Sequence, residues 1–194
     1  MAFSLDPRKT ALVLIDLQKG TLALPLAPYS AAQIVETSAA LGRRFADTGG
    51  TILPVRVAFA GDQADRPPQA VDTPMQLPPG GLPPDWSELA PEIAALPAAA
   101  VITKRQWGAF HGTELDLQLR RRGITTIVLG GIATNFGVES TAREAWQHNY
   151  AVVVAEDACT SLGEDLHRFS IEKVLPRVAR VRKAAEIMAA LQLA

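Results

Sequence analysis

The sequence of 194 residues has only one cysteine, three histidines and no excess charge of either sign. A single cysteine, Cys159, excludes an intramolecular disulfide and a cysteine-rich metal site, which is typical of a reducing compartment. The 19 basic residues are balanced by 20 acidic ones and form no long basic stripe, so nucleic-acid binding is not expected. His111, His148 and His167 are far apart in the chain, and we interpret each as a surface or loop residue rather than a metal ligand.

Long apolar runs are absent as well. No segment is long enough to span a bilayer, and the N-terminal stretch MAFSLDPRKT lacks the apolar centre of a signal peptide. We therefore expect a cytoplasmic protein with no membrane partner. Neither G-x-G-x-x-G nor G-x-x-x-x-G-K-[ST] occurs in the sequence, so no phosphate cradle for a nucleotide is predicted and no cofactor is expected.

What the sequence does contain is a regular alternation of short apolar runs and longer helical patterns. The length and the 48% apolar content suit a single domain over residues 1–194. Several runs are apolar on both faces, as a parallel strand between two layers of helices requires, so the pattern predicts a three-layer α/β/α fold with a six-stranded parallel sheet. Strands are expected at 11–16, 51–59, 100–105, 125–131, 151–158 and 179–183, and helices at 31–47, 113–122, 135–148, 164–175 and 184–191.

A proline-rich segment, 61–97, interrupts this alternation. Loops of this length in a compact domain are often functional, so the segment could fold over a site or reach a neighbouring subunit. In that case it would carry much of the substrate specificity. An ordered but inert excursion is an equally good interpretation.

Polar residues follow several of the predicted strands, at the sheet edge where parallel α/β proteins bind ligands. Asp16 comes after four apolar residues and so leaves the core at a half-buried position, where its pKa would rise unless a cation stood nearby. Lys104, at the end of another strand, could be that cation, and such a pair can carry out acid–base chemistry. From these two residues alone, a purely structural ion pair is at least as good an interpretation.

Three stretches, in order along the chain, carry a resemblance to a known family: ALVLIDLQKG, VITKRQWGAFHGTELDLQLRRRGITTIVLGGIATNFGVESTAREAW and YAVVVAEDACTS. With them the chain resembles the isochorismatase-like hydrolase superfamily, most of all its YecD-type bacterial members. The resemblance implies a Rossmann-like fold, a homo-oligomer (dimer or tetramer), hydrolysis of a small molecule, and Asp16 and Lys104 as the catalytic pair. It also implies a non-proline cis peptide bond at Ile132–Ala133 and a turn whose backbone amides, Ile132 to Thr134, face the substrate.

The sequence departs from the cysteine amidohydrolases of this superfamily. Their nucleophile position, at the start of the helix after this turn, is occupied here by Gly137. Cys159 lies at the end of the next strand and is interpreted as an inert buried thiol. Ser140 and Thr141 have no evident base beside them, so neither is expected to replace the thiol. The nicotinamidase metal ligands are also missing from the stretch RVAFAGDQ, and no metal site is predicted.

Isochorismatases likewise have glycine in this region, and the resemblance to them implies vinyl-ether hydrolysis. Neutral Asp16 would protonate the vinyl carbon and water would capture the cation, while Lys104 would orient the acid and bind a carboxylate of a small anionic substrate. Arg56 could clamp a second carboxylate and Trp107 could wall the pocket, although a surface arginine and a core tryptophan are equally good interpretations. The alternatives are non-covalent hydrolysis of an amide or another small molecule, and a catalytically silent binding or scaffold protein.

Overall fold

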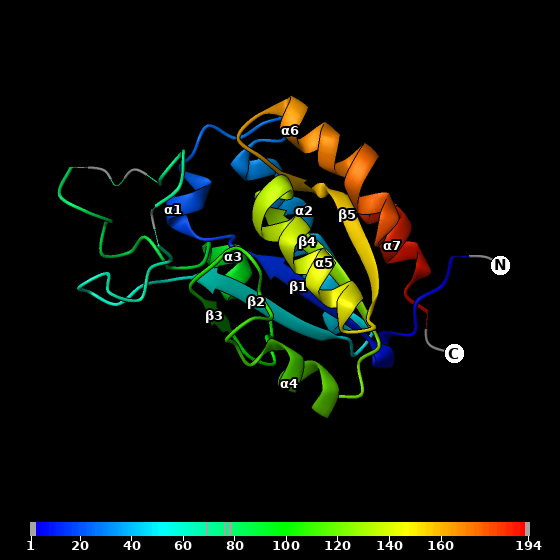
Figure 1. Ribbon diagram of the computed structural model, residues 1–194. Coiled ribbons are helices and arrows are strands. Elements are labelled where there is room, and N and C mark those ends of the chain that lie inside the picture. The colour runs from blue at the N-terminus through cyan, green and yellow to red at the C-terminus, as the bar shows by residue number, and fades with distance from the viewer. Residues whose placement is uncertain (1–2, 69, 76, 78, 193–194) are drawn as a thin grey trace.

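The structure is a computed structural model that describes residues 3–68, 70–75, 77 and 79–192. Its centre is a six-stranded parallel sheet. The strand order is β3-β2-β1-β4-β5-β6 (Figure 1). The strands are β1 (Thr10–Ile15), β2 (Thr51–Val57), β3 (Ile102–Lys104), β4 (Thr126–Ile132), β5 (Ala151–Thr160) and β6 (Arg180–Arg182). Each overlaps a strand that the sequence predicts, so the predicted fold class is confirmed.

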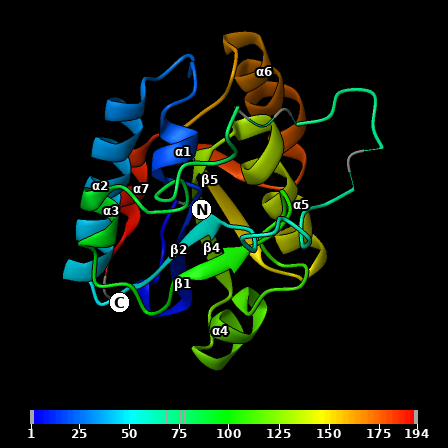
Figure 2. The same ribbon diagram turned by 90° about the vertical axis from the view of Figure 1, so that its left-hand side faces the viewer.

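Helices cover both faces of this sheet. They are α1 (Lys19–Leu22), α2 (Ala31–Asp47), α3 (Pro91–Ala94), α4 (Leu115–Arg121), α5 (Glu139–Gln147), α6 (Glu164–Phe169) and α7 (Ala184–Ala190). As Figure 2 shows, α2, α3 and α7 pack on one face, and α4 and α5 on the other. The short helices α1 and α3 were not predicted, because four residues are too few to show a helical period. In the part of the chain that the structure describes, no helix has the length and apolar content needed to cross a membrane.

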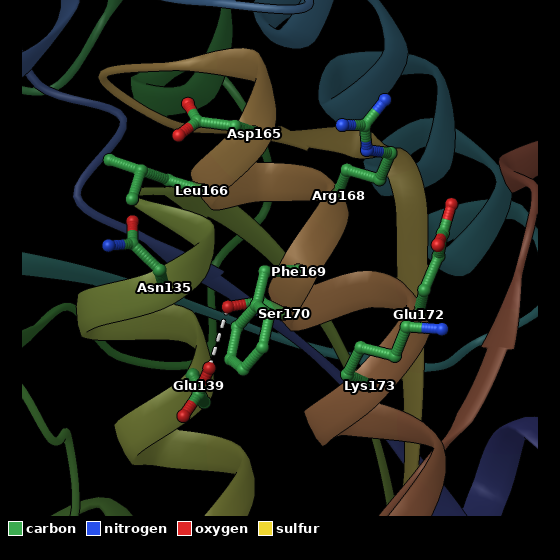
Figure 3. A pocket seen from close by; sticks show the side chains of 9 residues that line it. All are labelled: Asn135, Glu139, Asp165, Leu166, Arg168, Phe169, Ser170, Glu172 and Lys173. Carbon is green, nitrogen blue, oxygen red and sulfur yellow. Dashed lines mark hydrogen bonds between the residues drawn. The ribbon is translucent and has the colours of Figure 1, made fainter.

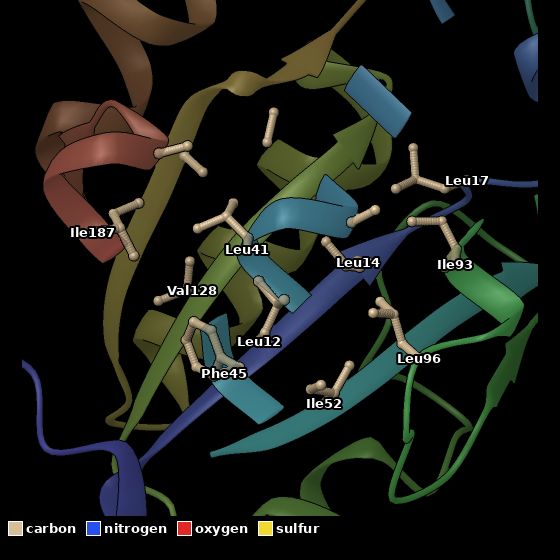
Figure 4. Close-up of a cluster of buried hydrophobic side chains, with 14 of the residues drawn as sticks. Leu12, Leu14, Leu17, Leu41, Phe45, Ile52, Ile93, Leu96, Val128 and Ile187 are labelled. Carbon is tan, nitrogen blue, oxygen red and sulfur yellow. The ribbon is translucent and has the colours of Figure 1, made fainter. Parts of the chain in front are cut away.

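The core is divided into two layers by the alternation of side chains along the strands. Leu12 and Leu14 of β1 pack with Phe45 of α2 in the layer shown in Figure 4. Val13 and Ile15 of the same strand belong to the layer under α4 and α5. All six residues of β1 are buried, which is why this run shows no polar face in the sequence.

The order of the strands determines where a ligand can enter. The chain adds β2 and β3 on one side of β1, and then returns to add β4 on the other side. Such a reversal opens a crevice at the carboxyl ends of the two strands that flank it, here β1 and β4. Asp16 directly follows β1 and Ala133 directly follows β4, so the topology brings both residues to this crevice.

Much of the segment 61–97 extends away from the body of the protein (Figure 1), but its last part is anchored. The carbonyl of Trp86 accepts hydrogen bonds from the Gly20 amide at 2.9 Å and from the Gln18 side chain at 3.2 Å. The indole also lies directly over Gly20, since an added Cβ there would be 2.0 Å from the ring. The anchored part therefore packs against the residues that follow β1. Residues 69, 76 and 78 of the segment lie outside the described residues.

Gly131, near the end of β4, allows a close backbone approach to β1. Its φ is +124°, and an added Cβ would lie 2.0 Å from the carbonyl oxygen of Ile15. We expect Gly131→Ala to lower the free energy of unfolding by several kcal/mol, since backbone strain costs about 1–3 kcal/mol and overpacking about 1–3 kcal/mol more. Urea denaturation measures this loss. The control is Gly61→Ala, which meets no atom within 4 Å and should change stability by about 0.5 kcal/mol or less; equal losses in the two variants would contradict the close approach.

Candidate active site

Asp16 lies at the point where the chain leaves β1. Its φ is +52°, a backbone conformation that few non-glycine residues adopt. The amide of Asp16 donates to the Val55 carbonyl at 2.9 Å, which ties this turn to the neighbouring β2. The carboxyl group is buried and lines a cavity at the edge of the sheet. The turn therefore holds a carboxyl group at the crevice that the strand order opens.

Lys104, the last residue of β3, forms a buried ion pair with Asp16. Its side chain is 2% exposed, and its Nζ donates to Asp16 Oδ2 at 2.7 Å. The same Nζ donates to the carbonyls of Trp107 at 2.8 Å and Gln106 at 3.1 Å. An ammonium group has three protons, so these three acceptors use all of them. The structure thus brings the two predicted catalytic residues together and fully satisfies the lysine.

The carboxyl group of Asp16 is electrostatically unusual. Burial raises its pKa from the ordinary 3.8 to about 6, although the nearby Lys104 ammonium pulls the pKa down. Oδ2 accepts from Lys104, whereas the buried Oδ1 has no hydrogen-bond partner among the described residues. An added Cβ at Gly137, which lines the cavity, would lie 3.4 Å from Oδ2, so Oδ2 is the carboxyl oxygen nearer to the cavity.

A cavity of about 130 Å³ opens beside the pair. Most of its lining is apolar, and the rings of Trp107 and Phe136 lie against each other with their centroids 4.7 Å apart. Trp107 is 62% exposed and lines the rim of the cavity. Of its two interpretations from the sequence, this position fits the pocket wall and not the core tryptophan. The lining residues are Asp16, Thr21, Leu24, Lys104, Trp107, Ile132, Ala133, Phe136, Gly137 and Leu162.

The turn after β4 forms a second side of the cavity. A cis peptide bond joins Ile132 and Ala133, at the position that the family resemblance implies. The backbone amides of Ala133 and Thr134 donate to no oxygen atom of the described residues. A π-helical turn, Thr134–Val138, follows and leads directly into α5. Free amides at the start of a helix are suited to hold an oxygen atom of a substrate.

Gly137 lies in this π-helical turn and faces Asp16. An added Cβ would be 3.0 Å from Ile15 Cγ2, 3.2 Å from the Ile132 carbonyl and 3.4 Å from Asp16 Oδ2. Any side chain at this position would therefore begin beside the Asp16 carboxyl group. The position is tightly packed against β1 and the turn, and glycine supplies no nucleophilic side chain there.

Two of the predicted binding residues do not line the cavity. Arg56 Nε donates to Thr103 Oγ1 at 3.2 Å. Thr103 directly precedes Lys104 on β3, so the side chains of these two residues point to opposite faces of the sheet. Arg56 therefore lies with Thr103 on the face opposite to Lys104. Thr134 is fully buried, with its hydroxyl group turned away to His167. The segment 61–97 contributes no residue to the lining within the described part of the chain.

Four lining residues were not anticipated from the sequence. Leu162 follows β5, so the rule that ligands bind at the carboxyl ends of strands could have identified it. Phe136 lies just after the turn that was predicted to bind substrate, within the predicted helix 135–148, and the structure places it in the π-helical turn Thr134–Val138. Thr21 and Leu24 belong to α1 and the residues after it, for which the sequence shows no periodic signal.

The prediction that His167 is a surface or loop residue is wrong. It is a buried residue of α6, with Nδ1 2.8 Å from Thr134 Oγ1 and Nε2 3.4 Å from Glu156 Oε1. Despite burial, hydrogen bonds from His167, Lys183 and Tyr29 lower the pKa of Glu156 to about 2. An ionised carboxylate only accepts, so Nε2 donates to Glu156, while Nδ1 shares a hydrogen bond with the Thr134 hydroxyl. This network fixes the Thr134 side chain from behind the turn.

A larger hollow, of about 580 Å³, lies between the π-helical turn Thr134–Val138 and α6 (Figure 3). It holds neither Asp16 nor Lys104. Ser170 donates to Glu139 at 2.6 Å across it, and charged groups of both signs surround it. Among the described residues, no three or more His, Cys, Asp or Glu side chains are grouped so that they could hold a metal ion. The hollow is lined by Asn135, Glu139, Asp165, Leu166, Arg168, Phe169, Ser170, Glu172 and Lys173.

Comparisons with known proteins agree with the resemblance read from the sequence. A family model described as "Isochorismatase domain" matches residues 10–186. The chain is 46% identical to the uncharacterized isochorismatase family protein YecD of Escherichia coli O157:H7, over 96% of this chain and 98% of that protein. A solved structure of an isochorismatase family protein from Burkholderia thailandensis is 44% identical, with a TM-score of 0.92 over 98% of this chain and 99% of that chain.

A shorter match has a named activity. The ureidoacrylate amidohydrolase RutB of Methylobacterium radiotolerans is 42% identical to the chain over 79 residues. This match covers 40% of the chain and 31% of that protein. Amide hydrolysis is thus the named activity of a relative of this chain, and the local match does not extend it to the chain itself.

Cys159 gives a direct test of whether a thiol has any part in the chemistry. It is fully buried at the end of β5, as predicted, and burial raises the pKa of its thiol above the ordinary value. We expect the native protein to remain unmodified and equally active after treatment with iodoacetamide, and the protein unfolded in guanidinium to be alkylated completely. Intact-mass spectrometry measures both. Rapid alkylation of the native protein with loss of activity would show that the thiol is accessible and needed.

Proposed function

Since the chain belongs to the isochorismatase family, we propose that it is a hydrolase of a small molecule in which Asp16 moves the proton and water, not cysteine, attacks. The observation that carries this proposal is the buried Asp16 carboxyl group, which lines a cavity and is held by the Lys104 ammonium at 2.7 Å; burial raises its pKa to about 6. Gly137 leaves the space beside that group without a nucleophile. An acid–base group is thus present where a covalent catalyst is missing.

A vinyl ether is the bond that suits this arrangement best. Neutral Asp16 gives its proton to the terminal vinyl carbon, and the ether oxygen supplies the electron pair that forms an oxocarbenium ion. Water adds to the cationic carbon and returns a proton to Asp16, and the resulting hemiketal releases the alcohol. A positioned general acid of this kind contributes a rate factor of about 10²–10⁴.

Lys104 supports the acid in both of its forms. It donates a hydrogen bond to Oδ2 of Asp16 and so holds the carboxyl group beside Gly137 in the cavity lining. When Asp16 has given up this proton, the ammonium group lies 2.7 Å from the new negative charge and stabilises it. The apolar side chains around the cavity keep bulk water away and strengthen this interaction.

Amide hydrolysis is the second candidate, and the turn after β4 favours it. The free amide of Ala133, which lines the cavity, could hold a carbonyl oxygen as it gains negative charge. Ionised Asp16 would then act as a base and take a proton from the attacking water. The match to a ureidoacrylate amidohydrolase supports the same bond type. The two candidates therefore require opposite protonation states of Asp16.

The sign of the pH dependence separates these candidates. If Asp16 is a general acid, kcat/KM on vinyl ethers stays constant below about pH 6 and falls about tenfold per pH unit above it, because only the neutral form reacts. If Asp16 is a general base, kcat/KM on amides falls on the acid side instead. The assay follows carbonyl product from a panel of vinyl ethers that includes isochorismate, and ammonia from amides.

The test variant and its control each replace one ion-paired aspartate by asparagine, so the change in charge is the same in both. Asp16→Asn is expected to lower kcat/KM by about 10²–10⁴ and to remove the pH dependence. Asp116→Asn breaks another aspartate pair, with Arg120 on α4 and outside the cavity, and should leave the activity unchanged. Circular dichroism and melting temperature establish that both variants fold. A folded wild-type protein that hydrolyses no member of either panel would contradict the proposal and leave a silent binding protein.

A further inference from the structure

The proline-rich segment 61–97 contributes no residue to the cavity lining within the described part of the chain, whereas the stretch that contains α1 contributes two. These two are Thr21 and Leu24. The hydroxyl group of Thr21 also donates a hydrogen bond to the backbone carbonyl of Asp16, so α1 is tied to the turn that carries the catalytic carboxyl group. Whatever holds α1 in place therefore acts on the site.

The helix α1 is too short to be stable by itself. It has four residues, and isolated helices shorter than about 12–15 residues are marginal in water. The first amides of a helix have no acceptor within it, and Gln18, which precedes α1, makes no side-chain hydrogen bond to cap them. Support must therefore come from another part of the chain, and it comes from residues 85–90, which we call the anchor segment.

The anchor segment caps α1 with its own backbone. The carbonyl of Glu88 accepts a hydrogen bond from the amide of Lys19 at 2.8 Å, and the carbonyl of Trp86 accepts one from the amide of Gly20 at 2.9 Å. These are the first two amides of α1. The ammonium group of Lys19 also pairs with Asp85 and Glu88, but all three side chains are exposed, so these ion pairs add little. The attachment thus depends mainly on the capping carbonyls and on packing.

The indole of Trp86 provides that packing. It lies directly over Gly20, where an added Cβ would be 2.0 Å from the ring, and it stacks on Phe59, which follows β2, with the ring centroids 6.1 Å apart. The fully buried side chain of Gln18 joins the same parts, because its Nε2 donates to the carbonyls of Trp86 at 3.2 Å and Val57 at 3.0 Å. The anchor segment, α1 and the end of β2 therefore form one packed unit beside the cavity.

We propose that Trp86 is a positioning residue of this site, an inference that rests on the proposed hydrolase function. Trp86 does not line the cavity, but it holds α1 and so determines where Thr21 and Leu24 meet the substrate. The segment 61–97 thereby takes part in substrate specificity through α1. This differs from the roles expected from the sequence, in which the segment folds over the site or reaches a neighbouring subunit.

Hydrogen exchange measured by NMR tests whether Trp86 holds α1, and it requires no activity. The amides of Leu22 and Ala23 donate to carbonyls within this helical turn. We expect both to exchange at least about tenfold faster in Trp86→Ala, because the turn opens without its cap, and at nearly the wild-type rate in Trp86→Phe, which keeps a ring over Gly20. The control is Trp146→Ala on α5, which is 56% exposed and outside the lining, and should change neither rate. Unchanged exchange in Trp86→Ala would overturn the inference.

A double-mutant cycle in the hydrolysis assay tests whether Trp86 acts through α1. We expect Trp86→Ala and Leu24→Ala each to raise KM by about threefold to tenfold at unchanged kcat, since both disturb the same wall of the cavity. The double variant should show no larger KM than the more affected single variant, because the two residues act as a unit. A merely structural role of Trp86 would instead lower the fraction of active protein, and so kcat, at unchanged KM.

The failures of the inference and of the proposed function are distinguishable. KM changes that multiply in the double variant, or a KM that Trp86→Ala leaves unchanged, would overturn the inference and leave the hydrolase function intact. A folded wild-type protein that hydrolyses no compound would overturn the proposed function and the inference that rests on it, while the exchange rates would still show whether Trp86 holds α1.

Discussion

The buried ion pair between Lys104 and Asp16 is the interaction on which the rest of the site depends. An unpaired ion in the core costs several kcal/mol, so the lysine can be buried only where Asp16 and two backbone carbonyls meet it. The carboxyl group follows β1, and the lysine ends β3 just before the two carbonyls, while β2 lies between these two strands. The pair therefore requires the register of three strands, and the fold and the site are set together.

The same burial gives the pair its chemistry and carries a cost in stability. The folded-state pKa of Asp16, about 6, lies above the ordinary 3.8. The stability that this carboxyl group contributes is therefore present below pH 3.8 and is lost as the pH rises through about 6. Near neutral pH the free energy of unfolding is therefore lower than it would be with an ordinary aspartate, and a group that can carry a proton lies beside a small apolar cavity. A site built only for stability would gain more from apolar side chains of the same volume.

The sequence predicts the features that depend on local pattern and on strand order. Apolar runs on both faces indicate the parallel sheet, and the carboxyl-end rule places Asp16 and Lys104 at one edge. It does not predict features set by contacts between distant segments. Arg56 could not be assigned to a face until β2 was paired with β3. The burial of His167 depends on Glu156, which lies where β5 shifts register against β4, and a lone histidine in a polar helical stretch gives no sign of it.

The central claim is that Asp16 changes protonation near pH 6, and the most direct measurement is the titration of its carboxyl carbon. In protein labelled with ¹³C at the aspartate side-chain carboxyl groups, the Asp16 resonance is the one that disappears in Asp16→Asn. The account predicts that its chemical shift moves with a midpoint near pH 6. A midpoint near the ordinary 3.8 would mean that the group is an ordinary ionised partner of Lys104, and would contradict its role as the acid of this site.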